Sequence, residues 1–509
     1  MNVLFDGLLK NKKLDDIFAE IPSSGSSRYF SYQGLIDASG RFANVLIDEG
    51  VQPGDRVAVQ VNKSIEAIIL YLATIRVGAV FLPLNTAYTV SEIAYFLENA
   101  SPTLFVCDPK RIGDFKTLLN DLDINNATLG VWENSDSDAG TLFAKALKAS
   151  EDFDTVPRDE NDLAAILYTS GTTGRSKGAM LSHNNLLSNA LALKDYWQFS
   201  DEDKLLHALP IFHTHGLFVA TNVTLVAGSS LIFLPAFNAD TIIDYLPNVS
   251  CMMGVPTFYT RLLDDQRLDR NLVEHMRLFV SGSAPLLAET HIEFESRTGH
   301  RILERYGMTE TNMNTSNPYE GDRRAGTVGF PLPGVEIRVA NPETGEVLAK
   351  GDVGVVEVRG PNVFSGYWRM PEKTKEEFRD DGFFITGDLG TIDEDGYLKI
   401  VGRAKDLIIS GGYNIYPKEI ELLLDEQDGV LESAVIGVPH ADFGEGVVGV
   451  LVAKPEHALD EAAIMSDIRD KIARFKQPKH LVVVDELPRN TMGKVQKNLL
   501  REQYSDLLR

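Results

Sequence analysis

The chain between residues 168 and 178 reads Tyr168-Thr169-Ser170-Gly171-Thr172-Thr173-Gly174-Arg175-Ser176-Lys177-Gly178, a stretch of glycines and hydroxyl side chains in which Lys177 supplies positive charge. The apolar run 163–167 before it predicts a buried strand. The pattern after it predicts a helix whose apolar face carries Leu187, Leu191 and Trp197. A strand, a glycine-rich turn and a helix bring backbone N–H groups together, and this arrangement binds phosphate. The sequence therefore predicts a phosphate-binding loop, and a flexible loop of small polar residues is the alternative.

The composition is that of a globular protein with a large core. The 509 residues are enough for about two to four domains. A net charge of −24 argues against a nucleic-acid or anionic-membrane partner, but it leaves room for a local cationic pocket. Cys107 and Cys251 have neither metal-site nor disulfide spacing, which suits a reducing compartment. Neither a signal peptide nor a membrane-length apolar run is apparent, so we expect a cytoplasmic protein without membrane insertion.

Strand and helix signals alternate through the first part of the chain. The expected strands are 56–61, 79–84 and 103–107, and the expected helices are 64–77 and 91–99. This alternation predicts an α/β fold with mostly parallel sheets flanked by helices. Short strands and turns over 334–360 predict a β-rich subdomain that completes a large N-terminal domain, residues 1–404.

The composition changes near residues 402–406, and a smaller α/β unit is expected beyond them. Pro417 suits the first turn of a helix over 417–426. The other expected elements are strands at 435–438, 447–453 and 480–484 and an amphipathic helix at 459–475. We therefore predict a small α/β C-terminal domain over residues 405–509.

The loop at 168–178 resembles the phosphate loop of the adenylate-forming superfamily, which includes acyl-CoA synthetases, luciferases and peptide-synthetase adenylation domains. Its spacing is not that of the P-loop G-x4-G-K-[ST], since Lys177 follows Gly174 by three residues and precedes a glycine. This chain has Ser176 where the superfamily usually has proline. The resemblance implies ATP binding by Thr169, Ser170, Gly171, Thr172, Thr173, Gly174 and Lys177.

The string Tyr306-Gly307-Met308-Thr309-Glu310 resembles the YGxTE motif of the same superfamily. The resemblance implies that the Thr309 hydroxyl meets the α-phosphate and that Glu310 helps to hold Mg²⁺. One carboxylate suffices because Mg²⁺ keeps several waters and also binds phosphate oxygens. Tyr306 would stack on adenine, with core packing as its alternative, and Ser283 in Ser281–Pro285 would line the adenine and acyl pockets.

Three later strings match the superfamily in order. Asp388, in Thr386-Gly387-Asp388, would accept from both ribose hydroxyls, since one carboxylate can take two donors. Arg403 would reach the ribose or the phosphates. Lys494, in Pro488-Arg489-Asn490-Thr491-Met492-Gly493-Lys494, resembles the catalytic lysine of the PRxxxGK motif.

The resemblance also implies a domain rotation. Lys405 and Asp406 lie where the superfamily has its hinge, although an exposed linker would carry similar charges. Gly411 and Gly412 would then line the channel for the pantetheine arm of coenzyme A, where a narrow tunnel requires the absence of side chains. A simple turn is the alternative for these glycines.

The acyl pocket would determine the substrate. Pro210-Ile211-Phe212-His213 resembles a superfamily string whose histidine borders the acid, and Met308 is expected nearby. Arg261 follows a predicted pocket segment, and its guanidinium could bind a second carboxylate; a surface arginine is the alternative. The strings 281–286 and 304–314 resemble those of malonyl-CoA synthetases, which favours a dicarboxylate.

Together these resemblances imply a ligase that uses ATP, Mg²⁺ and coenzyme A. The acid, a small dicarboxylate such as malonate or methylmalonate, would attack the α-phosphate to give an acyl-adenylate and pyrophosphate, and the CoA thiol would then displace AMP. Other short- or medium-chain acids, an enzyme loading a carrier protein, a luciferase and a non-enzymatic nucleotide-binding protein are the alternatives. The sequence leaves the oligomeric state open.

Overall fold

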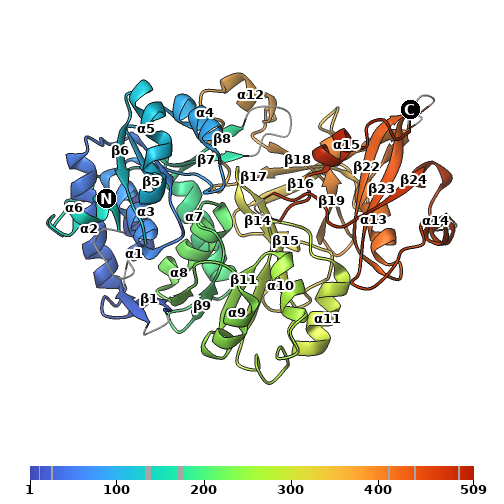
Figure 1. The fold of residues 1–509 in the computed structure, drawn as a ribbon, viewed down its shortest axis with the longest axis horizontal. Coiled ribbons are helices and arrows are strands. Elements are labelled where there is room, and N and C mark those ends of the chain that lie inside the picture. The colour runs from blue at the N-terminus through green and yellow to red at the C-terminus, as the bar shows by residue number, and fades with distance from the viewer. Residues whose placement is uncertain are drawn as a thin grey trace. The chain divides into compact units, whose positions relative to one another are not determined.

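The computed structural model describes residues 1–10, 12–23, 27–131, 139–169, 176–410, 413–440, 443–469, 471–490 and 493–508. The contacts within the chain divide it into two compact units. The first unit comprises Met1–Glu336 and Val358–Phe384, and the second comprises Ile337–Glu357 and Ile385–Arg509. Figure 1 labels their elements. These units are defined by contacts within the chain. The predicted boundary at residue 405, which concerns function, stays a prediction.

A six-stranded sheet forms one half of the first unit, with the order β6-β5-β3-β4-β7-β8. Its strands are β3 Arg56–Gln60, β4 Val80–Pro83, β5 Leu104–Cys107, β6 Asn125–Thr128, β7 Leu163–Thr169 and β8 Lys177–Ser182. The first five strands of this order run parallel, and β8 alone is antiparallel to its neighbour. The predicted parallel βα alternation is therefore confirmed here.

A nine-stranded sheet forms the other half, with the order β15-β14-β13-β12-β11-β9-β10-β1-β2. Its strands are β1 Ile17–Ile21, β2 Arg28–Ser31, β9 Lys204–His207, β10 Ser230–Phe233, β11 Cys251–Gly254, β12 Leu278–Ser281, β13 Leu303–Met308, β14 Asn312–Ser316 and β15 Phe330–Pro331. Strands β9 to β13 and β1 are parallel, so their carboxyl ends lie at one edge of the sheet.

Helices cover both sheets of the first unit. They are α1 Val3–Leu9, α2 Tyr32–Asp48, α3 Ile65–Val77, α4 Val90–Ala100, α5 Ile112–Asp121, α6 Gly140–Ala146, α7 His183–Tyr196, α8 Asn222–Ala227, α9 Ala239–Tyr245, α10 Pro256–Leu263, α11 Ala288–Thr298 and α12 Pro371–Glu376. Figure 1 shows α7 and α8 between the two sheets. Asn189 on α7 donates to the Met313 carbonyl of β14 over 2.8 Å, which joins this central helix to the nine-stranded sheet.

The element after the phosphate loop differs from the prediction. We expected a strand, a loop and then a helix, whereas β7 and β8 form an antiparallel hairpin in which Thr169 pairs with Lys177. The helix α7 begins only at His183, after a cap by Ser182. Its predicted apolar face was also wrong, because the Leu191 side chain is exposed while Trp197 is fully buried.

The second unit contains two antiparallel-rich sheets. The four-stranded sheet has the order β16-β17-β18-β19, with bounds Glu336–Ala340, Gly354–Arg359, Phe384–Ile392 and Leu398–Arg403. The other has the order β21-β20-β23-β22, with β24 paired to β23. Its strands are β20 Ile408–Ser410, β21 Tyr413–Ile415, β22 Val430–His440, β23 Gly444–Ala453 and β24 His480–Val484. The β-rich segment expected at 334–360 is thus confirmed.

Three helices complete the second unit: α13 Pro417–Asp425, α14 Glu461–Arg469 and α15 Lys497–Gln503. The helix expected at 459–475 is shorter, since α14 ends at Arg469 and a separate turn of 3-10 helix follows at Arg474–Lys476. In the described parts of both units, the chain has no helix whose length and apolar character would suffice to cross a bilayer.

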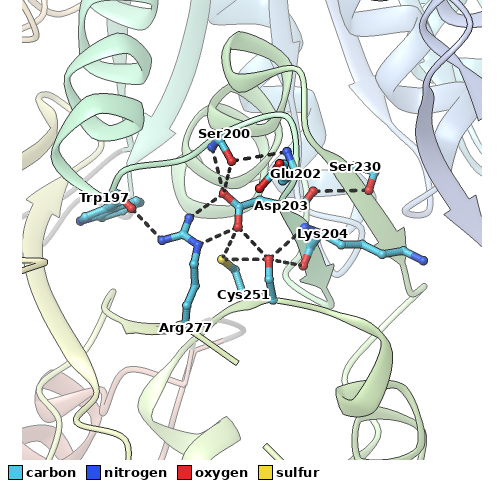
Figure 2. Close-up of polar contacts among 9 residues, drawn as sticks. Trp197, Ser200, Glu202, Asp203, Lys204, Ser230, Cys251 and Arg277 are labelled. Carbon is cyan, nitrogen blue, oxygen red and sulfur yellow. Dashed lines mark hydrogen bonds and ion pairs between the residues drawn. The ribbon is translucent and has the colours of Figure 1, made fainter. Parts of the chain in front are cut away.

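A buried ion pair joins the amino ends of several strands of the nine-stranded sheet (Figure 2). Asp203 immediately precedes β9, and its carboxylate accepts two hydrogen bonds from Arg277, which immediately precedes β12. Ser250 and Cys251, at the start of β11, also donate to this carboxylate. The pair lies at the amino ends of these strands, opposite the edge where ligands bind in open parallel sheets, so it is placed to stabilise the sheet.

Candidate active site

Four predicted site segments of the first unit follow carboxyl ends of strands in the nine-stranded sheet (Figure 1), whereas the phosphate loop lies between β7 and β8 of the six-stranded sheet. Residues 210–215 come after β9, residues 255–261 after β11, residues 282–285 after β12 and residues 309–310 after β13. In open parallel sheets this edge is where ligands bind, because loops from several strands meet there. The topology therefore brings together strings that are up to a hundred residues apart in sequence.

Glu310 lies in a polar network at this edge. Its carboxylate is buried, and its Oε1 lies 3.0 Å from the Tyr367 hydroxyl oxygen. The backbone carbonyl of Glu310 accepts from the amide of Phe364 at 2.8 Å, which holds the turn against the segment 361–367. Thr309, beside it, is only partly buried, so its hydroxyl lies at the boundary of the site.

Lys177 is the one predicted phosphate-loop cation, and it lies at the first position of β8. Its ammonium is 2.8 Å from Oε1 of Glu377 and 4.1 Å from the centre of the Tyr367 ring. Thr169, its ladder partner on β7, donates its hydroxyl to the Lys177 carbonyl at 3.4 Å. The other predicted loop residues, Ser170 to Gly174, lie outside the described residues.

Ser283 and His215 face each other where the acyl and adenine pockets are expected. The Ser283 hydroxyl lies 3.2 Å from Nδ1 of His215, and Ser283 has a φ of 73°, a backbone conformation unusual for a residue with a side chain. Strained positions of this kind are common at binding sites. Burial lowers the pKa of His215 well below its ordinary value, and the positive charge of Arg305 lowers this pKa further, so the ring is neutral.

Arg305 on β13 is a buried cation that the sequence did not single out. Its side chain packs over Gly282, where a Cβ atom would lie 2.4 Å from the guanidinium carbon, so a side chain at 282 would displace the guanidinium. Its Nε and Nη2 have no hydrogen-bond partner among the described residues. Burial lowers the pKa of Arg305 to about 9, so the group remains charged at neutral pH. An unpaired buried cation is costly, and a ligand carboxylate would offset that cost.

The other residues predicted for the acyl pocket differ in how far their side chains are buried. His213 and Met308 are partly buried at the strand edge, as is Tyr306, so all three can contact a ligand there. Arg261 lies on α10 as predicted, but its side chain is exposed, and no ion pair is recorded for it within the described residues. Its proposed role stays a prediction.

The second unit holds the residues predicted for ribose binding. Asp388 is buried at 4% exposure, and its Oδ1 lies 2.6 Å from Nε of Arg403 on the adjacent strand β19. Asp388 and Arg403 are direct partners in the β18–β19 ladder, which fixes their spacing. The Thr386 hydroxyl caps the turn by accepting from the Asp388 amide at 3.0 Å. The ion pair orients a carboxylate that can accept from a diol.

Three other predictions belong to the same unit. Lys405 and Asp406 form a short 3-10 turn, Ala404–Asp406, and Asp406 is paired with Arg501 at 2.6 Å. Burial lowers the pKa of Lys405. Lys494 is exposed on a tight loop in which its amide donates to the Asn490 side chain at 3.0 Å. Gly411 and Gly412 lie outside the described residues.

Comparison with known proteins defines the class to which this fold and site belong. A family model described as AMP-binding enzyme matches residues 11–368, and a second, AMP-binding enzyme C-terminal domain, matches residues 419–494. The chain belongs to this family of AMP-binding enzymes. The predicted superfamily and the α/β fold of its large N-terminal part are thereby confirmed.

The similarity to individual members extends over the whole chain. A malonate–CoA ligase of Arabidopsis thaliana is 36% identical over 490 residues, which are 90% of this chain and 79% of the relative. A long-chain-fatty-acid–CoA ligase of Bacillus subtilis is 31% identical over 98% of this chain and 96% of its own length. The solved structure of ATP-bound MatB from Rhodopseudomonas palustris is 57% identical, covers 100% of both chains and has a TM-score of 0.96.

Four residues at the site were missed by sequence reasoning: Arg305, His215, Tyr367 and Glu377. Arg305 has no local signal, because the residues before it, Arg301-Ile302-Leu303-Glu304, mix charged and apolar side chains. Tyr367 and Glu377 carry no local signal, since their contacts to Glu310 and Lys177 join positions 57 and 200 residues apart.

Proposed function

We propose that this chain is an AMP-forming ligase that joins malonate to coenzyme A at the expense of ATP. The observation that carries the choice of a dicarboxylate is Arg305, a charged and buried guanidinium beside Ser283 and His215. A monocarboxylic acid has one carboxylate, which reacts at the α-phosphate, and would leave this cation unpaired. Malonate has a second carboxylate that a guanidinium can bind with two parallel hydrogen bonds.

Arg305 replaces Arg261 as the first candidate for binding the distal carboxylate. An exposed guanidinium such as that of Arg261 is solvated by water and gains little from a ligand anion. A buried guanidinium gains more, because its partner is met at low dielectric and satisfies Nε and Nη2. Neutral His215 adds no competing positive charge at the same place. This cluster supports recognition of a small dianion.

The proposed reaction has two steps. In the first step the free carboxylate of malonate attacks the α-phosphorus of ATP, and pyrophosphate leaves. The negative charge that develops on the phosphate oxygens would be stabilised electrostatically by Lys177, Thr309 and Lys494. In the second step the thiolate of coenzyme A attacks the acyl carbonyl, and AMP leaves as Asp388 and Arg403 hold its ribose.

The residues present also fit a magnesium ion. Glu310 provides one buried carboxylate, and the described residues contain no cluster of three acidic, histidine or cysteine side chains that would hold a metal by themselves. A single carboxylate suits Mg²⁺, which completes its octahedron with water and phosphate oxygens. Glu310 would therefore hold the ion, whose chemistry is to neutralise the phosphate oxygens.

We also propose a cytoplasmic location. Both cysteines of the chain, Cys107 and Cys251, are free and buried. Burial raises the pKa of each thiol to about 12, so both stay protonated and resist oxidation. Neither cysteine contributes a disulfide, as suits a reducing compartment. Subcellular fractionation with an antibody against the native chain would test this location.

The experiment that tests the substrate compares acids and two arginine variants. Acyl-CoA formation with ATP and coenzyme A is followed by mass for malonate, methylmalonate, succinate, propionate, acetate and octanoate. We expect malonate to give the highest kcat/KM in the wild type. Arg305→Met keeps an unbranched apolar stem but removes the guanidinium, and it should cost about 2–5 kcal/mol in kcat/KM for malonate, with little loss for propionate.

The matched control is Arg261→Met, which removes an exposed guanidinium from α10 and should change the malonate-to-propionate ratio by less than about twofold. Retained propionate activity in Arg305→Met demonstrates that the variant is folded. A malonate-to-propionate ratio unchanged by Arg305→Met, or altered mainly by Arg261→Met, would refute the role of Arg305. Preference of the wild type for octanoate would refute the proposed substrate itself.

A further inference from the structure

Four side chains of the first unit form a continuous chain of contacts from the phosphate loop to Glu310. The Lys177 ammonium lies 2.8 Å from Oε1 of Glu377. The other oxygen of Glu377, Oε2, lies 2.6 Å from the Tyr367 hydroxyl. That hydroxyl lies 3.0 Å from Oε1 of Glu310, and the Tyr367 ring lies under the Lys177 ammonium. Of these four residues, the proposed mechanism uses only Lys177 and Glu310.

Glu377 is held firmly in this chain of contacts. It caps the carboxyl end of α12, and its side chain is only 20% exposed. Burial raises the pKa of its carboxyl, but hydrogen bonds from Lys177 and Tyr367 lower this pKa by more, so the group is ionised at neutral pH. A partly buried, ionised partner makes the pair with Lys177 stronger than an exposed ion pair would be.

The Tyr367 hydroxyl determines the orientation of Glu377. A phenol has one proton to donate, and it lies nearer to Glu377 than to Glu310. Donation to Oε2 leaves Oε1 of Glu377 directed at Lys177. Tyr367 itself is almost completely buried, so its hydroxyl is fixed in place. The geometry thus points one particular carboxylate oxygen at the lysine of the phosphate loop.

An ammonium that pairs with Glu377 in this way is only partly available to a polyphosphate. Lys177 has three N–H donors, and a triphosphate would have to draw the ammonium away from Glu377 or share it. Lys373 offers a second cation at 3.2 Å from the same oxygen of Glu377. Glu377 therefore keeps a partner when Lys177 leaves, which reduces the cost of breaking the first pair.

We propose that Glu377, oriented by Tyr367, is a positioning residue that holds Lys177 and competes with the phosphates of ATP for it. The inference rests on the proposed ATP-dependent function of the same site. Lys177 then has two positions: in one its ammonium pairs with Glu377, and in the other it pairs with the nucleotide. The competition weakens ATP binding, and it would correspondingly ease the departure of pyrophosphate.

The test measures nucleotide binding apart from turnover. Isothermal titration with a non-cleavable α,β-methylene analogue of ATP and Mg²⁺ gives a Kd for each variant. Glu377→Gln keeps the size and the hydrogen bond to Tyr367 but removes the charge, and we expect its Kd to be about three- to tenfold lower than that of the wild type. Glu376→Gln is the matched control, because the neighbouring Glu376 is exposed and, among the residues that the structure describes, pairs with Lys373 alone.

A double-mutant cycle with Lys177→Ala separates competition for Lys177 from general charge repulsion. If Glu377 acts through Lys177, Glu377→Gln should leave Kd unchanged within about twofold in the Lys177→Ala background. The proposal is overturned by a raised Kd in Glu377→Gln, by an equal effect in Glu376→Gln, or by an effect that persists without Lys177. Absence of analogue binding by the wild type would instead refute the proposed function, which keeps the two failures distinct.

Discussion

Arg277 donates two hydrogen bonds to the Asp203 carboxylate, from Nε to Oδ1 at 2.6 Å and from Nη2 to Oδ2 at 2.7 Å (Figure 2). The planar fork of the guanidinium matches both carboxylate oxygens, which is the strongest geometry for this pair of groups. Arg277 also donates to the Trp197 carbonyl at 3.0 Å. The amino ends of β9 and β12 and the end of α7 are thereby tied together, away from the edge that carries the candidate site.

Loss of this pair should affect stability and leave chemistry intact. Asp203→Ala leaves a half-buried guanidinium without its carboxylate and should lower the free energy of unfolding by about 2–4 kcal/mol. Urea unfolding followed by tryptophan fluorescence measures this change. Asp201→Ala is the control, since Asp201 forms an exposed pair with Lys13 and its loss should leave the free energy of unfolding nearly unchanged. Similar losses in the two variants would contradict the structural role of Asp203.

The contribution of Asp203 should also depend on pH. Burial raises the pKa of the Asp203 carboxyl, but hydrogen bonds from Arg277, the Ser200 amide and Ser250 lower it by more, so the folded value lies below the ordinary one. The stabilisation is then present above the unfolded pKa of about 3.9 and is lost as the pH falls through the folded pKa. The stability difference between wild type and Asp203→Asn should be constant from about pH 7 to 5 and shrink below about pH 4. A constant difference down to pH 2.5 would contradict this.

The Asp388–Arg403 pair leads to a prediction about the sugar of the nucleotide. Asp388→Asn removes the charge and one of the two acceptor oxygens while keeping the shape of the turn. We expect KM for ATP to rise about 10- to 100-fold, whereas KM for 2′-deoxy-ATP, already weakened, should rise much less. The ratio of the two KM values is the measurement. A ratio equal to that of the wild type would place the ribose elsewhere.

Much of the fold follows from local patterns, and particular elements show where those patterns are sufficient. The helix expected at 64–77 is α3, Ile65–Val77, with Ser64 as its cap, and the strand expected at 480–484 is β24. In both, the apolar pattern and the end signals agree. The helix α7 is different: it lies between two sheets, so tertiary packing and not its own periodicity decides which of its leucines are buried.

The residues of the candidate site could be predicted only where they lie in continuous sequence motifs. Lys177, Glu310 and Asp388 are in strings that could be read. Lys177 begins β8 and Glu310 follows the end of β13, whereas Asp388 lies in the middle of β18. Glu377 could not be found in this way, because its significance comes from Lys177, 200 residues away. Contacts of this kind depend on how α12 packs against the β7–β8 hairpin, and no spacing along the chain encodes that packing.

The hinge prediction concerns Lys405, in the 3-10 turn Ala404–Asp406. Lys405→Pro fixes φ near −65° at this position and should restrict rotation of the backbone there. Pyrophosphate exchange should survive, while malonyl-CoA formation should fall by about tenfold or more if the second step requires the rotation. Lys405→Ala removes the same side chain without fixing φ and is the control. An unchanged ratio of the two rates in Lys405→Pro would place the hinge elsewhere.

Lys494 provides the strictest test of the two-step mechanism. Its loop is held by the backbone, since the Asn490 amide donates to the Lys494 carbonyl at 2.9 Å and Gly493 has a φ of 73°. Lys494→Ala therefore removes the ammonium without disturbing the loop. Formation of the adenylate should lose about 4 kcal/mol or more of transition-state stabilisation, roughly a thousandfold in rate. Conversion of preformed malonyl-adenylate to malonyl-CoA should remain nearly intact, because that step forms no bond at phosphorus.

Rapid-quench assays of each half-reaction measure both rates, and Lys479→Ala, which removes an exposed lysine, is the control. Equal losses in the two half-reactions would mean that Lys494 serves both steps, and the assignment of one conformation to each step would fail.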